Sequence, residues 1–130
     1  MGTRFIPTAD AGPRVRDVML LEPNTVPPTT TVAEARRIFE SPRQKALLVC
    51  DGSRYVGAIG RDGLDGAETD APLARLVDAQ APTLGPEDET ARVFEVVERH
   101  GLTRIPVVDA DSSLLGLVCF NRSRDAFCVA

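Results

Sequence analysis

Hydrophobic and polar positions in the first half of the chain predict one helix followed by two strands. Residues 31–34 read Thr-Val-Ala-Glu, a capping box in which the hydroxyl and the carboxylate each satisfy a free amide of a first helical turn. The Ser-Pro pair at 41–42 ends this helix. Two apolar runs, 46–50 and 55–59, flank a polar Asp-Gly-Ser turn and predict an antiparallel hairpin. Apolar side chains recur at the spacing of one helix face at Val32, Ala35, Ile38 and Phe39.

The second half repeats this order. A helix is predicted over residues 88–100, with Gly101 as its C-cap. The acidic residues 87–89 are expected at the positive end of this helix, and Arg99 and His100 at its negative end. Strands are predicted at 105–108 and 114–120. The apolar face of the helix consists of Val93, Phe94, Val96 and Val97.

The two halves align as an internal repeat. Val49 corresponds to Val107, 58 residues later, and Gly57 corresponds to Gly116 after one inserted residue. Before each half lies a segment that predicts a short helix, at 15–20 and 72–79. At 130 residues, the chain is long enough for one domain, or for two small halves that share a core.

Composition excludes several classes of function. Nineteen acidic against fifteen basic residues give a net charge of −4, which argues against a nucleic-acid or anionic-membrane surface. Aromatic residues make up only 5% of the chain, so base-stacking platforms are not indicated. No secretory signal or membrane-spanning apolar run is present in the sequence. We therefore expect a soluble protein located in the cytoplasm.

The residues that could carry catalysis have simpler explanations. Cys50, Cys119 and Cys128 show no metal-ligand spacing, and no metal site is expected. Cys50 and Cys119 lie in predicted buried strands, where a thiol acts as a small apolar group. His100 suits a helix end, and Cys50 has no histidine in its own half to act as a base. We expect no enzymatic activity.

The repeated segments resemble a known family, the tandem cystathionine-beta-synthase-type (CBS) domain pair or Bateman module. The resemblance covers about residues 14–127 and gives a first repeat at 14–70 and a second at 71–130, after an N-terminal extension at 1–13. It rests on short segments that follow one another in the same order in both halves. They are Val-Arg-Asp-Val-Met at 15–19, Thr-Val-Ala-Glu-Ala at 31–35, Gly-Leu-Thr-Arg-Ile-Pro-Val-Val-Asp at 101–109 and Leu-Gly-Leu-Val at 115–118.

The resemblance implies an α/β fold in which two β-α-β-β-α repeats pack with pseudo-twofold symmetry, leaving two clefts between them. It implies a regulatory role through AMP, ADP, ATP, S-adenosylmethionine or NAD, and assembly into flat homodimers. Apolar helix faces that exceed what a thin module can cover also favour a dimer. With no second domain in view, the regulated protein would be a separate chain.

The sequence departs from the family pattern Gly-h-h-Thr-x-x-Asp, in which h is apolar, the hydroxyl reaches a phosphate and the Asp holds the ribose. The Thr position is Gly60 in the first half and Cys119 in the second. The Asp position is Gly63 in the first half and Arg122 in the second, with Asp62 one residue early. The alternative to a ligand sensor is therefore a structural dimerisation module whose sites are degenerate.

If a nucleotide binds, the second half is expected to provide the better site. Main-chain groups around Thr83 and at Ile105, Pro106 and Val107 would read the base, and Pro106 would leave the strand able to present carbonyls. Arg104 and Arg122, which begins the expected final helix, would pair with phosphate. The corresponding positions in the first half are Thr25, Ala46 and Leu48.

A glycine-rich stretch after the hairpin of the first half offers a second, weaker phosphate site. It begins at Gly60, Arg61 and Asp62 and ends at Gly66, and its amides could cradle an anion. The sequence matches no established phosphate-loop motif. The alternative is a shortened second helix in that half.

Overall fold

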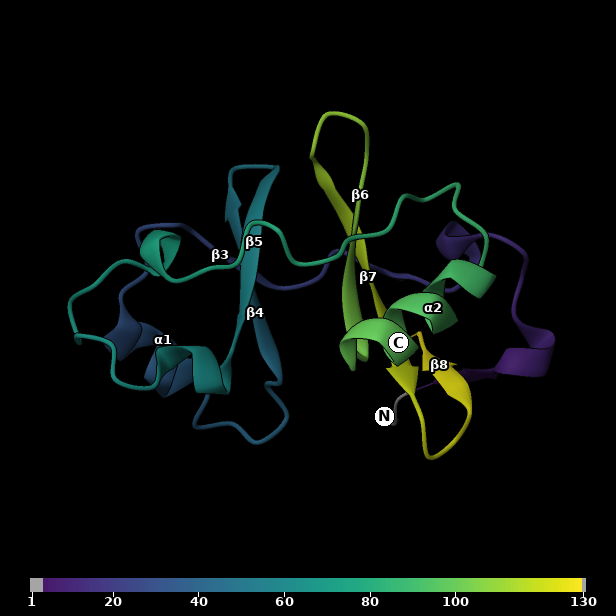
Figure 1. Ribbon diagram of the computed structural model, residues 1–130, viewed down its shortest axis with the longest axis horizontal. Coiled ribbons are helices and arrows are strands. Elements are labelled where there is room, and N and C mark those ends of the chain that lie inside the picture. The colour runs from purple at the N-terminus through teal and green to yellow at the C-terminus, as the bar shows by residue number, and fades with distance from the viewer. Residues whose placement is uncertain (1–3, 130) are drawn as a thin grey trace. The chain divides into compact units, whose positions relative to one another are not determined.

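The computed structural model describes residues 4–129 and divides the chain into two compact units (Figure 1). One unit runs from Asn24 to Ala81, and the other combines the chain before Asn24 with the chain from Pro82 onward. Each unit contains a β-sheet and an α-helix, which confirms the expected α/β class.

The Asn24–Ala81 unit has a three-stranded sheet in the order β3-β4-β5. The short strand β3 (Thr25–Val26) pairs parallel to β4 (Ala46–Asp51), which pairs antiparallel to β5 (Arg54–Gly60). The helix α1 (Val32–Ile38) follows β3. The predicted helix and hairpin are thus confirmed within one or two residues of their expected ends.

The capping box explains why α1 begins where it does. The Glu34 amide donates to Thr31 Oγ1 (3.2 Å), and the Thr31 amide donates to Glu34 Oε1 (3.1 Å). The hydrogen bond from the Thr31 amide lowers the pKa of Glu34. The core of this unit consists of Val32, Ala35, Phe39, Leu47, Val49, Ile59, Leu64 and Leu73.

The other unit has a five-stranded sheet around β7 (Leu114–Asn121). One edge of β7 pairs antiparallel with β6 (Arg104–Val108). Two shorter strands, β2 (Leu20–Leu21) and β8 (Ala126–Cys128), also pair antiparallel with β7, and β1 (Phe5–Pro7) pairs with β8. The predicted hairpin at 105–108 and 114–120 is confirmed.

The helix of this unit, α2 (Ala91–His100), starts later than expected. Its first turn contains no acidic residue, so the predicted dipole role of residues 87–89 is wrong. The Asp88 carboxylate instead accepts from the Gly85 amide (2.8 Å), and Glu87 pairs with Arg16 (2.8 Å). Its end is as predicted, because Gly101 caps it in the left-handed conformation with φ of 66°.

The two lead-in segments form single 3-10 turns, at Val15–Asp17 and Leu73–Arg75, rather than the longer helices expected at 15–20 and 72–79. The first amide of each turn bonds to a loop outside the segment. Val15 N donates to Asp88 O (2.8 Å), and Leu73 N donates to Thr30 O (2.8 Å). Each compact unit therefore includes the lead-in segment of the opposite sequence repeat.

The chain after β7 does not form the helix expected to begin at Arg122. A turn at 122–125 follows, in which Asn121 Oδ1 accepts from the Arg124 amide (3.0 Å) and Asp125 has φ of 49°. The chain then returns as β8, which lies between β1 and β7 in the sheet. The expected β-α-β-β-α order is therefore wrong for the second half. Its last element is a strand because Phe127 is fully buried there.

Candidate ligand pocket beside Arg104 and Arg122

Strand register places three side chains in a row across the sheet. Cys119 of β7 lies opposite Arg104 of β6 on one edge and opposite Cys128 of β8 on the other. Residues directly opposite on paired strands share a face of the sheet. The neighbouring pair, Phe120 and Phe127, therefore points to the other face, where the core lies.

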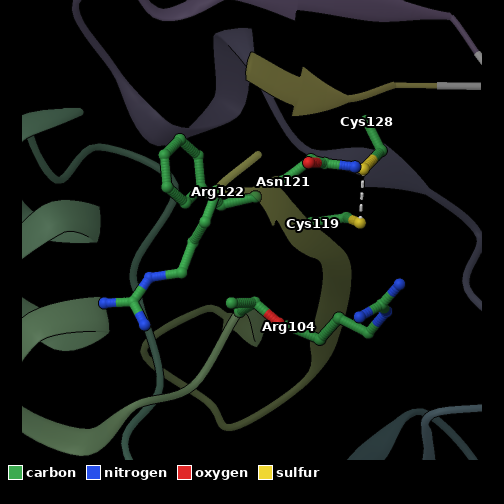
Figure 2. A pocket seen from close by; sticks show the side chains of 7 residues that line it. Arg104, Cys119, Asn121, Arg122 and Cys128 are labelled. Carbon is green, nitrogen blue, oxygen red and sulfur yellow. Dashed lines mark hydrogen bonds between the residues drawn. The ribbon is translucent and has the colours of Figure 1, made fainter. Parts of the chain in front are cut away.

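This row forms one wall of a pocket of about 220 Å³ (Figure 2). Three of the sequence-predicted ligand residues, Arg104, Cys119 and Arg122, are thereby brought together. The other residues that line the pocket are Thr103, Phe120, Asn121 and Cys128.

The pocket is positively charged. Its lining includes the guanidinium groups of Arg104 and Arg122 and no acidic side chain. Within residues 4–129 neither guanidinium group makes a hydrogen bond or an ion pair. Figure 2 shows the two arginine side chains extending toward opposite sides of the pocket. The arrangement therefore suits an elongated anion, or two anionic groups, better than one phosphate held by both arginines.

A family model for the CBS domain matches residues 15–66 and, a second time, residues 73–120. The chain belongs to the CBS-domain family, as a tandem pair. This confirms the resemblance drawn from the repeated segments.

Individual relatives support the assignment. Inosine-5'-monophosphate dehydrogenase of Korarchaeum cryptofilum is 31% identical over 105 residues, which is 80% of this chain. The match spans only 21% of that enzyme's length.

Solved structures share the fold at lower identity. CBSX2 in complex with AMP superposes with a TM-score of 0.74 at 20% identity, covering 88% of this chain and 93% of that one. The cytosolic domain of the Mg²⁺ channel MgtE in complex with ATP gives 0.72 at 21% identity, covering 82% of this chain and 46% of that one. Among the described residues of the CBS pair, no helix is long and apolar enough to cross a membrane.

Ile105, Pro106 and Val107, which are expected to read a base, lie in β6, the strand that also contributes Arg104 to the pocket. The side chains of Ile105 and Val107 are fully buried in the core, so only their main-chain groups remain available. The Pro106 carbonyl accepts from the Leu84 amide (2.9 Å), the residue after Thr83. The Pro106 carbonyl is thus engaged by the main chain, and the carbonyl presentation expected of this strand stays a prediction.

The first-half candidates belong to the Asn24–Ala81 unit. Thr25 pairs with Leu48, and Ala46 pairs with Gly60, across neighbouring strands. Leu48 is 4% exposed, so its side chain has little surface left for a ligand. None of these residues lines the pocket beside Arg104.

Arg61 stabilises the fold of its own unit instead of remaining available for phosphate. Its Nη2 donates to the carbonyls of Phe39 (2.8 Å), Ser41 (3.2 Å) and Gln44 (3.1 Å), and its guanidinium lies over the Phe39 ring. This cation thus satisfies the carbonyl of the Phe39 C-cap of α1 and two carbonyls of the loop that follows the helix. The predicted role of Arg61 in phosphate binding is not supported by this geometry.

The glycine-rich stretch forms a short 3-10 helix, Arg61–Leu64, rather than a phosphate cradle. The Asp65 amide is already bonded to the Asp62 carbonyl (3.1 Å), and Gly60 adopts an extended conformation with φ of −92°. Within the stretch only Gly66 is left-handed (φ of 73°), and Asp65 before it is extended (φ of −61°, ψ of 127°), so the paired right- and left-handed residues of an anion-binding nest are not present. The structure thus matches the alternative, a shortened second helix.

Sequence reasoning missed Cys128 and Asn121 as pocket residues. A helix was expected after Arg122, and a helix would not place residue 128 opposite residue 119. The available signal was the Ala-Phe-Cys run at 126–128, whose central Phe127 is as apolar as a core strand requires.

Proposed function

We propose that this CBS pair is a non-catalytic regulatory module that binds an adenosine nucleotide and controls a separate protein in the cytoplasm. The observation that carries the proposal is the pair of arginines, Arg104 and Arg122, in a pocket with no acidic lining residue. Structural neighbours that contain AMP and ATP, and a relative that is an inosine-5'-monophosphate dehydrogenase, support the choice of a nucleotide.

The size of the pocket suggests which part of the nucleotide it takes. Pockets that enclose whole small molecules measure roughly 300–1,000 Å³. At about 220 Å³, this pocket suits the phosphate end, with the nucleoside lying outside it. The base would then be read by main-chain groups near Thr83, as the sequence analysis expects.

The absence of the family's ribose-binding aspartate changes which ligand we expect this chain to prefer. Arg122 stands where the family pattern has an aspartate, so a hydrogen-bond acceptor for ribose is replaced by a donor for phosphate. A hydrogen bond to a charged group is worth about 1.5–3 kcal/mol, or about ten- to a hundredfold in affinity. We expect ATP and ADP to bind more tightly than AMP, and adenosine to bind most weakly.

Thermal shift and calorimetry with adenosine, AMP, ADP, ATP, S-adenosylmethionine and NAD test the proposal. A ligand that binds only the folded state raises the melting temperature. Arg122→Glu and Arg104→Glu should each weaken ATP about tenfold or more and leave adenosine unchanged. Arg43→Glu, an exposed residue of the Asn24–Ala81 unit, makes the same change in net charge and should leave ATP binding intact.

A structural dimerisation module is the alternative function, favoured by Gly60 and Cys119 at the positions of the family's phosphate-binding threonine. It predicts no stabilisation by any of these ligands. We propose a homodimer for either function, and sedimentation at micromolar concentration measures it directly. A single species of 14.0 kDa would contradict the dimer.

A further inference from the structure

Two cysteines face each other across the C-terminal hairpin. Cys119 of β7 and Cys128 of β8 are direct partners in an antiparallel pair. Directly opposite residues in such a pair have Cα atoms about 4.5–5.5 Å apart, within the range of about 4.4–6.8 Å that a disulfide spans. The Cys119 and Cys128 sulfur atoms lie 2.6 Å apart, joined by the dashed line in Figure 2. The two sulfur atoms therefore meet without movement of the backbone.

A small reagent can reach these thiols. Both line the pocket beside Arg104, and Cys128 is only partly buried. Cys50 differs in each respect, because it is buried in β4 of the Asn24–Ala81 unit and does not line this pocket. Cys119 and Cys128 thus form a paired site, and Cys50 serves as an internal control.

Charged and titratable neighbours set how readily the pair reacts. Burial, together with the adjacent Cys119 thiol, raises the pKa of Cys128 to about 12, and the Arg104 guanidinium opposes this shift. The thiolate is the reactive form, so Cys128 should react slowly at neutral pH and faster as pH rises. This behaviour suits a slowly adjusting modification site rather than a rapid peroxide sensor.

We propose that Cys119 and Cys128 form a redox-modification site, at which hydrogen peroxide converts the two thiols into an intramolecular disulfide. The Cys128 thiolate attacks one peroxide oxygen, the O–O bond breaks, and a sulfenic acid and one water form. The Cys119 thiolate then attacks the sulfenic sulfur, the S–S bond forms, and the sulfenic hydroxyl group takes up a proton and leaves as a second water. Two thiols lose two electrons and two protons overall, and the peroxide is reduced to two waters. A dithiol reductant reverses the reaction by exchange.

The test is a thiol count on the full chain, reduced and then treated with hydrogen peroxide. Of the three thiols, two should disappear and the third, Cys50, should remain, with a loss of two hydrogens in the intact mass. Peptide mapping should join residue 119 to residue 128, and dithiothreitol should restore all three thiols. Oxidation should also raise the melting temperature by several degrees, because the closed loop restricts the unfolded chain.

Three variants make the result specific. Cys50→Ala should still lose two thiols to one intramolecular disulfide. Cys128→Ser changes a half-buried position and Cys119→Ala removes one atom from a buried one, so each should fold and should lose the intramolecular link. A disulfide that involves Cys50, disulfide-linked dimers in place of the internal link, or oxidation of all three thiols at equal rates would overturn the proposal. Because no nucleotide is used, these outcomes are independent of the proposed ligand.

Discussion

Truncation of Phe127 to alanine tests whether the chain ends in a buried strand. Phe127 is fully buried in β8, and its ring lies 5.5 Å from the centroid of Phe120 and 6.0 Å from that of Phe94. The strand is held on both sides, by β1 and by β7, so the backbone cannot easily close around the space that the missing ring leaves.

The expected cost follows from this burial. Truncation of a buried phenylalanine to alanine lowers the free energy of unfolding by about 3–5 kcal/mol, which includes the lost aromatic contacts. Domains of this kind are stable by only about 5–15 kcal/mol, so a large share would be lost. With a urea m-value of about 2 kcal/mol/M, the unfolding midpoint should fall by about 2 M.

Urea unfolding followed by circular dichroism measures the change, with an unchanged m-value as the check that only stability has moved. Leu21→Ala is the matched control, because Leu21 is 71% exposed and its truncation should alter stability by no more than about 0.5 kcal/mol. A loss below about 1 kcal/mol for Phe127→Ala would refute the buried strand and reopen the possibility of a surface helix after Asn121.

Three further changes test local features by the same unfolding assay. Thr31→Ala removes the hydroxyl of the capping box and should cost about 1 kcal/mol, most of which Thr31→Ser should keep. Tyr55→Phe should stabilise the protein by about 1 kcal/mol, because the hydroxyl is buried with no hydrogen-bond partner among the described residues. Burial raises the pKa of Tyr55 from 10.0 to about 12, so stability present below pH 10 should decline as pH rises through about 12. Tyr55 is the only tyrosine and there is no tryptophan, so tyrosinate absorbance reports this group alone, and a folded-state midpoint near 10 would contradict the shift. Gly116→Ala would bring a Cβ within 2.5 Å of the Leu20 carbonyl and should cost about 1–3 kcal/mol, whereas Gly60→Ala meets no atom within 4 Å and should be neutral.

Local sequence signals predicted the elements whose ends have a recognisable capping residue. The Thr31 capping box and the Gly101 cap each satisfy helix-terminal groups with atoms only a few residues away, so the sequence contains the whole explanation. The start of α2 has no such capping residue. Thr90 makes no side-chain cap and instead donates its hydroxyl to the Gly12 carbonyl, a residue 78 positions earlier. A contact of that range is invisible to periodicity.

The pocket was predicted in part for a similar reason. Arg104 and Cys119 are neighbours in a hairpin that the sequence marks clearly, and register follows from the hairpin. The addition of Cys128 depends on β8, whose second neighbour besides β7 is β1, a strand more than 100 residues away in sequence. The Arg122 turn that precedes it is stabilised by Asn121, a residue that a helix could use equally well. Short apolar runs such as 126–128 become strands only when a partner edge is available.

The two hairpin glycines leave room for the lead-in segments that the repeats exchange. At Gly116, an added Cβ would meet the Leu20 carbonyl at 2.5 Å, and at Gly57 it would meet the Val77 Cβ at 2.9 Å. Each glycine therefore accommodates a lead-in segment, and in each case the segment comes from the opposite repeat. The loops that receive the lead-in amides are equivalent too, since Asp88 and Thr30 lie 58 positions apart, as do Val15 and Leu73. Both loops offer equivalent carbonyls, so the repeated sequence indicates the two docking sites. It does not determine which lead-in segment binds at each one. That choice is made by the strand pairing of Leu20 with Leu117, a long-range contact that places the first lead-in segment on the second hairpin.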